Sequence, residues 1–498
     1  MKKIYNIFLM PLLLVLVPSC YGIDEENFKV LEPIAFNDVS PTIDVMNGEE
    51  LVYGDLVVTS ALPCTYEWAY GVKKSSASAG EYDMQSIQVI SDKPDIRHTF
   101  TRVGQYILRL RVDNGESIAY KYFTLNVNSG LDEGVLILSN DEEGNGALTY
   151  IQNETDVEKS KVWDDIFTTI NTDNTLVRAT DMYLSSHTAS GVTYKQLLVS
   201  TDDGRGSIYK LDPMSFALYN TMPLRELIGT SCLEFSGEAT SGATYNYVFQ
   251  VGADGKTLRY DLFADFVTER TDATASGEAK GSKMMISTTN RKPVLYNETT
   301  LFLPGYGKVT TQTLKGYNIV NFYSDRSKNV VYVLFRSQED KDTYRIKTTT
   351  NTLGAFKDPP VNKADFSAPE MTMTEESALV TSLAAPNYIY YSNANKVYRF
   401  DIQSVAFASA PVVTLPDGET ICDMATSYVV KGGSTGFEGT AGDNIKNERY
   451  LYIATYNENR TGDRKGSLYI YDFSTHELVV GYEGIFGRPV RVMYKSRV

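Results

Sequence analysis

The sequence predicts an all-β protein in which a β-sandwich is followed by a β-propeller. Glycine (36), tyrosine (35) and phenylalanine (21) are plentiful among the 498 residues, and short apolar runs are separated by turn-forming residues, which favours strands over long helices. Between Gln105 and Val112, every second residue is apolar, as in a strand with one buried face. From Gly134 onward a short signature recurs, and repeated hairpins favour a ring of similar sheets.

The first 19 residues have the composition of a signal peptide. Two lysines open the chain, and an apolar run from Ile7 to Val17 follows. That run is about half the ~20 residues needed to cross a hydrocarbon core, so we expect residues 1–19 to be a removable signal. Val17-Pro18-Ser19-Cys20 resembles a bacterial lipobox, in which the cysteine is acylated and becomes the new N-terminus. Cys20 is therefore the predicted lipidation site; an ordinary signal peptide with a chance cysteine is the alternative.

Residues 20–27 are predicted to form a lipidated acidic tether. Asp24, Glu25 and Glu26 lie directly after the lipidation site. This cluster resembles the surface-export signal of Bacteroidota lipoproteins, which implies display on the outer face of the outer membrane. A solvated acidic tether without that role is the alternative. No later segment is a long uninterrupted apolar run, so we expect the mature protein to be anchored by lipid only and not to span the membrane.

The charge and the cysteines exclude several classes of function. The net charge of −15 becomes −17 once the two lysines of the signal are removed, and such an acidic chain has no electrostatic footprint for nucleic acid. Cys64, Cys232 and Cys422 lie far apart with no CxxC pair, which fits neither a disulfide framework nor a zinc site. We expect buried free thiols, with one long-range disulfide as the alternative, and we predict no metal and no cofactor.

Residues 28–129 are predicted to form the sandwich. Strand-like runs occupy 56–59, 65–70 and 105–112, and a returning strand occupies 120–127. Asp113-Asn114-Gly115 separates the last two runs, and Asn-Gly is a strong hairpin signal.

Three segments of this region resemble the end of a PKD domain, which is an immunoglobulin-like sandwich: His98-Thr99-Phe100, Gly104-Gln105-Tyr106 and Val112-Asp113-Asn114-Gly115. Trp68 would fill the place of the tryptophan-bearing strand of that family. The family's Gly-Asp-Gly turn is replaced by Tyr70-Gly71-Val72-Lys73. The resemblance implies a spacer or adhesion module, and it makes His98 part of the fold and not a catalytic base.

Residues 130–498 are predicted to form the propeller, because a five-residue signature recurs there. Large apolar residues stand one and three positions before an aspartate in 208–212, 257–261, 397–401 and 468–472. Residues 344–347 match without the aspartate, and 148–151 match more weakly. Each copy follows another strand and a polar turn, which predicts one hairpin per repeat.

The spacing of the signature predicts seven blades. A four-stranded blade takes roughly 40–50 residues, and Asp212 and Asp261 are 49 positions apart. The next interval, to Lys347, spans 86 positions, which leaves room for a blade without a signature around Met284 to Leu303. Six visible units and this one give seven; six or eight blades, or a second set of sandwich domains, are alternatives.

Two further segments complete the predicted ring. The interval between the last two signature aspartates is 71 positions, and the glycine-rich loop from Lys431 to Asn444 accounts for its excess length. Near the C-terminus, Pro489 to Tyr494 is predicted to pair with the first blade and close the ring.

The search for catalytic residues gives no site. A serine or cysteine hydrolase needs a base beside its nucleophile, and His187 has no Gly-x-Ser-x-Gly elbow to pair with. His476 falls in a predicted turn. Pairs of carboxylates stay an alternative, because acidic residues are abundant and their pairing is three-dimensional.

Two acidic stretches and one tryptophan are candidate binding residues. Asp141 to Gly146 partly resembles the start of a calcium loop, but Gln152 occupies the position of the bidentate glutamate. Asp202 to Gly206 is shorter still, so hairpin turns are the better interpretation of both. Trp163 is the stronger surface candidate of the two tryptophans, although burial is favoured. Ligand-binding residues are left unassigned.

The lipidation signal, the sandwich and the repeats together resemble the PKD-like family lipoproteins of Bacteroidota. Members of that family commonly accompany an outer-membrane TonB-dependent transporter of the SusC type and its SusD-like lipoprotein. The resemblance implies a non-enzymatic accessory of such an importer, anchored in the outer membrane and facing the cell exterior. Oligopeptides are favoured over glycans as its ligand, because related systems often lie beside peptidases. The chain also has only two tryptophans, the residues that commonly stack on sugar rings.

Three alternatives to this function differ in class. A glycan-binding surface lipoprotein would work in the same kind of system. A propeller hydrolase would cleave surface-bound oligomers with an acidic pair in the central channel, and a structural adhesin would bind neither ligand class.

Overall fold

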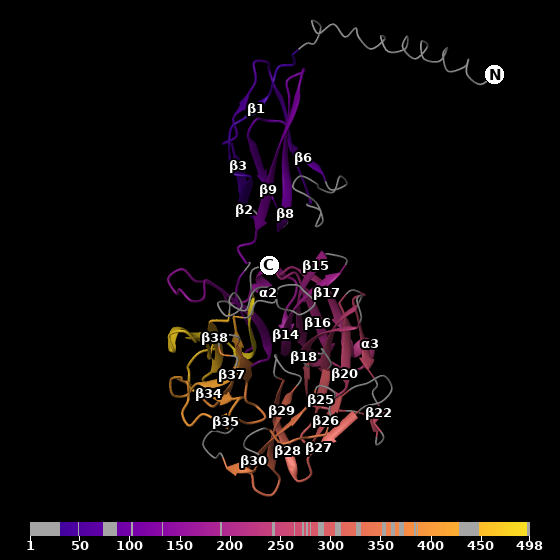
Figure 1. The fold of residues 1–498 in the computed structure, drawn as a ribbon, viewed down its shortest axis with the longest axis vertical. Coiled ribbons are helices and arrows are strands. Elements are labelled where there is room, and N and C mark those ends of the chain that lie inside the picture. Colours follow the sequence, from indigo (N-terminus) through magenta and orange to yellow (C-terminus); the bar gives the residue numbers. More distant parts are fainter. Residues whose placement is uncertain are drawn as a thin grey trace, which may run out of the picture. The chain divides into compact units, whose positions relative to one another are not determined.

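The computed structural model describes residues 30–495, with gaps at 48, 73–86, 101–102, 132, 190–191, 242–244, 263, 271–272, 275–276, 279, 287–292, 304–309, 325–329, 351–354, 360–363, 368–372, 383–384, 386 and 428–447. Cys20, Asp24, Glu25 and Glu26 lie outside the described residues, and so does the loop from Lys431 to Asn444. The chain divides into two compact units, residues 1–128 and 129–498. Both are built almost wholly of strands (Figure 1), which confirms the predicted all-β class.

The described part of the first unit contains one five-stranded sheet. The order of its strands is β2 (Thr42–Met46), β9 (Ile118–Asn128), β8 (Gly104–Asp113), β5 (Thr65–Val72) and β6 (Gln88–Ser91). β2 runs parallel to β9, and the other neighbours are antiparallel. Two small sheets accompany it, β1 (Ala35–Phe36) with β4 (Val58–Thr59) and β3 (Glu50–Tyr53) with β7 (Ile96–Thr99).

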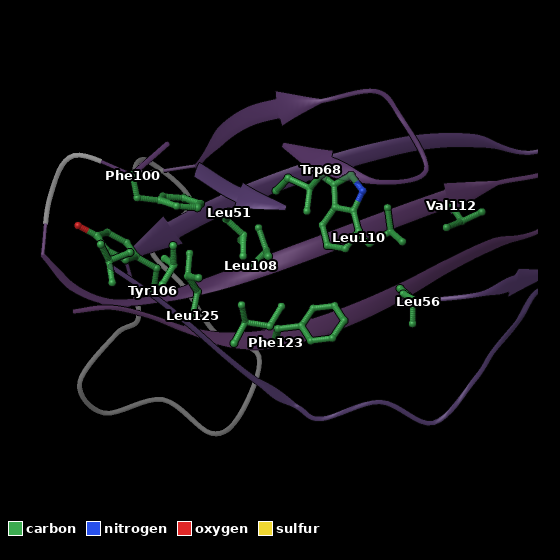
Figure 2. Close-up of a cluster of buried hydrophobic side chains, with 14 residues drawn as sticks. Leu51, Leu56, Trp68, Phe100, Tyr106, Leu108, Leu110, Val112, Phe123 and Leu125 are labelled. Atoms are coloured by element: carbon green, nitrogen blue, oxygen red, sulfur yellow. The ribbon is translucent and has the colours of Figure 1, made fainter. Parts of the chain in front are cut away.

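A single apolar cluster holds this unit together (Figure 2). Trp68 is fully buried and stacks on Phe123, with ring centroids 6.1 Å apart. The predicted apolar face of β8 is confirmed, because Tyr106, Leu108, Leu110 and Val112 are all buried. Arg109 and Arg111 of the same strand are only partly buried and pair with Glu67 and Asp113. The rings of His98 and Phe100 pack with their centroids 4.7 Å apart, and burial lowers the pKa of His98.

The hairpin predicted at Asn114-Gly115 exists, but its loop is longer than a two-residue turn. Asp113 of β8 pairs with Ile118 of β9, which leaves four residues in the loop. The Asn114 side-chain oxygen accepts the backbone N–H groups of Glu116 and Ser117 at 3.0 and 2.7 Å. The buried asparagine thus organises the turn through its side chain.

The described part of the second unit contains seven antiparallel sheets of four or five strands. Six of them are formed by consecutive strands of the chain, and the first also includes the C-terminal strand. The first sheet contains, in sheet order, β41 (Arg488–Lys495), β10 (Gly134–Asn140), β11 (Asn145–Gln152) and β12 (Lys161–Trp163), and β13 (Leu176–Val177) also pairs with β11. The second sheet contains β14 (Ala179–Ala189), β15 (Val192–Thr201), β16 (Ser207–Leu211) and β17 (Leu218–Pro223). The third sheet contains β18 (Cys232–Ser241), β19 (Tyr245–Gly252), β20 (Thr257–Asp261) and β21 (Phe266–Arg270).

The remaining four sheets follow in chain order. The fourth sheet contains β24 (Lys283–Ile286), β25 (Pro293–Tyr296), β26 (Thr300–Leu303) and β27 (Thr310–Thr313), and the fifth contains β28 (Tyr317–Ser324), β29 (Val331–Ser337), β30 (Thr343–Thr349) and β31 (Phe366–Ser367). The sixth sheet contains β32 (Leu379–Thr381), β33 (Tyr388–Asn393), β34 (Lys396–Asp401) and β35 (Ala406–Phe407), and β36 (Val413–Thr414) also pairs with β34. The seventh sheet contains β37 (Thr420–Thr426), β38 (Tyr450–Tyr456), β39 (Gly466–Asp472) and β40 (Glu477–Phe486).

Short elements fill the connections of the second unit. α2 (Ile166–Ile170) begins at Asp165, whose side chain accepts two backbone N–H groups of the first turn. α3 (Leu224–Ile228) ends at Gly229 in the left-handed region. β22 (Ala273–Thr274) pairs with β23 (Gly277–Glu278). In the described residues no helix is long and apolar enough to cross a membrane.

The apolar cores of the second unit lie between neighbouring sheets. One cluster joins the first sheet to the second through Leu136 and Leu197, and another joins the seventh sheet back to the first through Ile470 and Ile137. The colours of Figure 1 accordingly pass around this unit in chain order, from magenta through orange to yellow. Each sheet buries its faces against its neighbours, and this arrangement fits a β-propeller.

The C-terminal strand returns to the first sheet. Residues of β41 pair antiparallel with β10 from Gly134↔Lys495 to Asn140↔Arg488. The predicted pairing of Pro489 to Tyr494 with the first sheet is therefore confirmed. A four-stranded sheet, β24 to β27, lies where the sequence had room for a unit without a signature.

The recurring signature marks the third strand of a sheet. Its copies fall in β16, β20, β30, β34 and β39, and the weaker copy falls in β11. The aspartate that ends four of them starts the turn to the fourth strand. Four residues later the backbone has a positive φ in each case: Phe216 (56°), Asp265 (59°), Val405 (52°) and His476 (61°). The signature is therefore a strand followed by one shared turn geometry.

Candidate functional site

A cavity of about 550 Å³ lies where the innermost strands of the seven sheets converge. This volume falls within the ~300–1,000 Å³ typical of ligand sites. Every sheet contributes at least one residue to its wall. The polar residues of the wall are Thr180, Asp181, Glu234, Ser282, Lys283, Asn321, Glu376, Ser377, Cys422, Asp423 and Arg491.

β-Bulges lie beside five of these residues. The strand register shifts between Ala179 and Asp181, between Cys232 and Glu234, between Ile319 and Asn321, between Ile421 and Asp423, and between the β10 residues opposite Arg491 and Pro489. A bulge re-aims a side chain that regular alternation would place against a neighbouring sheet. Because five of the strands that line the cavity have a bulge beside a polar residue, the wall of the cavity is polar.

Arg491 is the centre of the charged group in this cavity. Its Nε and Nη2 donate to the two carboxylate oxygens of Asp181 at 2.6 and 3.0 Å. Nη2 lies 3.6 Å from Oε1 of Glu234, and Nη1 lies 3.8 Å from Oδ1 of Asp423. Three carboxylates from three different sheets thus share one guanidinium.

Two of the carboxylates also bind the backbone. Asp181 is 1% exposed and accepts the N–H of Phe235 at 2.6 Å. Asp423 accepts the N–H of Val492 at 2.8 Å. A buried carboxylate is tolerated where it is paired and hydrogen-bonded, and both of these groups meet that condition.

Burial and neighbouring charges shift the pKa values in opposite directions. Burial raises the pKa of Glu234 and of Asp423, and the charge of Arg491 offsets only part of that rise. Burial alone would lower the pKa of Arg491, but the carboxylates of Asp181 and Asp423 raise it well above its ordinary value. The guanidinium therefore stays charged, whereas the burial of Glu234 and Asp423 is only partly compensated.

Two further charged residues of the wall are Lys283 and Glu376. The Lys283 ammonium donates to the backbone carbonyl of Glu375. Glu376 is exposed, and its carboxylate has no ion-pair partner in the described part of the chain. The wall as a whole has four carboxylates and two cations, so its formal charge is negative.

A smaller apolar hollow adjoins the cavity. It has a volume of about 30 Å³ and lies between the fifth and sixth sheets, with Leu334, Ile346, Met373 and Phe407 among its lining residues. Asn321 and Leu379 line both spaces. An apolar group at the edge of the cavity would therefore find an apolar slot beside a polar wall.

None of the candidate residues from the sequence is among the described lining residues of this cavity. His187 lies in β14 opposite Tyr194, and His476 forms the predicted turn after β39. Asp141 accepts the backbone N–H groups of Glu143 and Asn145 at 2.9 and 2.7 Å, so this stretch is a hairpin turn, as predicted.

Two other weighed features also have structural roles. Asp203 forms the second predicted hairpin turn by accepting the N–H of Arg205 at 2.9 Å. Trp163 is half-buried, and the Lys161 ammonium lies 4.4 Å from its ring centroid. Within the described residues, no group of three His, Cys, Asp or Glu side chains could hold a metal ion.

The three cysteines beyond the predicted signal are free thiols, but only Cys232 is fully buried. Cys64 and Cys422 are half-buried, so the expectation of buried thiols is wrong for these two. Cys422 belongs to the wall of the cavity, and burial raises its pKa to about 11. A thiol that stays protonated at neutral pH is a poor nucleophile.

Sequence reasoning missed the residues of the cavity wall. They come from strands up to 310 positions apart, as for Arg491 and Asp181. One signal was available: an acidic or polar residue stands two positions after an apolar one at each bulge, as in Ala179-Thr180-Asp181, Cys232-Leu233-Glu234 and Ile421-Cys422-Asp423.

No model of a known protein family matches the chain, and no curated protein matches it. Two solved structures from Bacteroides are similar in fold. A quinonprotein alcohol dehydrogenase-like protein from Bacteroides thetaiotaomicron is 14% identical with a TM-score of 0.46, covering 94% of this chain and 100% of its own. A candidate 6-phosphogluconolactonase from Bacteroides fragilis is 10% identical with a TM-score of 0.43, covering 73% and 98%. At these values neither likeness bears on what this chain binds or catalyses.

Proposed function

We propose that the seven sheets of the second unit are the blades of one β-propeller and that the first unit is a PKD-like, immunoglobulin-like sandwich. The apolar cluster that joins the seventh sheet to the first supports a closed ring of seven. The buried Trp68, at the centre of the core between the sheets of the first unit, supports the sandwich.

We further propose that the protein is a surface-exposed outer-membrane lipoprotein, anchored through Cys20, that binds oligopeptides for a SusC-like transporter and its SusD-like partner. The observation that carries the binding role is the polar cavity to which all seven sheets contribute. Its buried carboxylates Asp181 and Asp423 are already held by Arg491 and by backbone N–H groups. Carboxylates so engaged are poorly placed to transfer a proton, which favours a binding role over a catalytic one.

The anchor and the partner are tested together. Outer membranes from cells that produce the native chain should yield it in complex with a TonB-dependent transporter. Cys20→Ala should release a folded protein and abolish its contribution to uptake. Undiminished peptide uptake by cells with the released variant would contradict the surface role.

A hydrolase is the second candidate, and one observation favours it. Burial raises the pKa of Glu234 and Asp423 in the same cavity, and a carboxyl group with a raised pKa is suited to act as a general acid. Cleavage of peptides or glycans by the purified protein, lost in Glu234→Gln, would establish this candidate. Binding of glycans without cleavage would instead favour the glycan-binding alternative.

A further inference from the structure

We propose that the central cavity binds an oligopeptide through its free amino terminus, with Glu376 and Glu234 as the wall carboxylates that attract the ammonium; this rests on the proposed binding function and names the group that is recognised. The two carboxylates belong to different parts of the ring. Glu234 comes from β18 of the third sheet, and Glu376 lies just before β32 of the sixth sheet. A ligand in the cavity can therefore meet both.

The cations of the wall are already engaged by the protein. Arg491 makes its two short bonds to Asp181, and Lys283 donates to the carbonyl of Glu375. Arg491 is therefore committed to a carboxylate of the protein, and Lys283 uses one of its three N–H donors on the backbone. An anion would also enter a wall whose carboxylates outnumber its cations.

The carboxylates are less completely compensated. Glu234 has the 3.6 Å approach of Arg491 as its described ion pair and also feels the charge of Lys283, whereas Glu376 has no ion pair among the described residues. A cationic group inside the cavity would be attracted more strongly than in bulk water, because the surrounding protein lowers the effective dielectric. Charge-assisted bonds from an ammonium to a carboxylate are the stronger kind.

The rest of the wall suits a peptide better than a simple amine. Ser282 is exposed on the cavity wall, and its hydroxyl is placed to bond an amide group of a peptide. The adjoining apolar hollow of about 30 Å³ is next to Asn321. Since a water-sized group needs about 10–15 Å³ of such space, a small apolar side chain fits there.

The bulges provide an independent argument that this wall is built for a ligand. Inner strands that served only packing would keep their alternation, yet a polar residue follows the register shift in β14, β18, β28 and β37. Bulges are concentrated next to binding and active sites because they re-aim individual side chains.

The test compares two probes that differ at the amino terminus, which is charged in one and acetylated in the other. Tri-alanine and N-acetyl-tri-alanine are titrated calorimetrically into the full mature chain. Tri-alanine should bind at least tenfold more tightly. Glu376→Gln should remove most of that difference, and Glu234→Gln provides a second variant. The matched control is Glu339→Gln, which changes an exposed carboxylate outside the cavity wall and should leave the preference intact.

The possible outcomes distinguish recognition of the amino terminus from peptide binding in general. Equal affinity for the two probes would overturn recognition of the amino terminus while leaving a peptide-binding function in place. Binding of neither probe would overturn both. A tenfold preference that survives both cavity variants would also overturn the assignment, because the ammonium would then be recognised elsewhere.

Discussion

Arg491 belongs to the last strand of the chain, yet its guanidinium contacts carboxylates from three other sheets. Asp181, Glu234 and Asp423 lie on the second, third and seventh sheets, and all approach it within 3.8 Å. The residue therefore has a structural role besides any part in binding. It fixes the closing strand to its neighbours and neutralises groups that burial would otherwise protonate.

Arg491→Met should destabilise the second unit strongly. Methionine retains much of the volume but leaves Asp181, with a side chain 2% exposed, without its cation. Removing one partner of such a buried pair costs about 3 kcal/mol or more of the free energy of unfolding. Urea unfolding followed by circular dichroism measures it.

The control for this variant lies on the same strand. The side chain of Arg488 is 60% exposed and lies over the ring of Tyr456 at 5.0 Å. Arg488→Met should cost less than about 1 kcal/mol, the range of an exposed cation–π contact. Equal losses in the two variants would show that the charge cluster adds nothing to stability.

Glu234→Gln should change how stability depends on pH. Burial raises the pKa of Glu234 in the folded protein, whereas the unfolded value is about 4.3. The folded state then binds the proton more tightly, so the native protein loses stability as the pH rises from about 4.3 through the folded pKa. Glutamine does not titrate, so the variant should gain relative to the native protein over this range and keep that gain at pH 7.

Urea midpoints at pH 4 and pH 7 test this prediction, and a further midpoint at about pH 2 tests the contrasting variant. The contrasting variant is Asp472→Asn, because bonds from Arg449 and Ser474 hold the pKa of Asp472 below its usual range despite its burial. Its contribution to stability is present above the unfolded pKa of about 3.9 and is lost as the pH falls further. The same pH trend in both variants would contradict the assigned shifts.

At the scale of the element, the signature strand carries its own turn. Asp401 accepts the backbone N–H groups of Gln403 and Ser404 at 2.8 and 3.1 Å, and Val405 then adopts a φ of 52°. Asp472 likewise accepts the N–H of Ser474 at 2.7 Å. Aspartate favours such turns because its short side chain bonds the backbone two residues on.

Asp401→Ala should lower the free energy of unfolding by about 1 kcal/mol, the usual loss when a side chain that caps backbone N–H groups is removed. Asp401→Asn keeps the accepting oxygen and should cost less. Thermal unfolding of the two variants and of Asp417→Ala, which changes an exposed aspartate, gives the comparison. A loss in the asparagine variant as large as in the alanine variant would exclude the turn as the cause.

These elements also show what sequence reasoning could reach. The signature located one strand of a hairpin in each repeat, and the alternation in β8 predicted its buried face, because both patterns are local. The site escaped prediction because it depends on bulges, and a register shift at Asp181 or Glu234 is set by the partner strand. The meeting of Arg491 with Asp181 further requires the ring to close, which no local pattern encodes.

At the scale of the whole second unit, closure depends on a strand far from its partner in sequence. β41 pairs with β10 along its full length, and Lys495 at its end is fully buried, with its ammonium donating to the carbonyl of Leu131. The first sheet would otherwise present the edge of β10, with Val135 and Ile137, which are buried in the closed ring. An open apolar edge of this kind is a site for strand addition.

A chain that ends at Gly487 should therefore unfold at a clearly lower urea concentration, and a peptide of residues 488–495 should restore the midpoint. The peptide can add to the edge of β10 as β41 does, because main-chain bonds supply affinity and alternate side chains supply register. Rescue should saturate with peptide concentration, since binding to the folded state shifts the unfolding equilibrium by mass action. The same peptide with Arg491→Met should rescue less, because it lacks the bonds to Asp181. If the shortened chain unfolded at the midpoint of the full chain, the ring would not depend on its closing strand, and the cavity would have to be held by the other six inner strands alone.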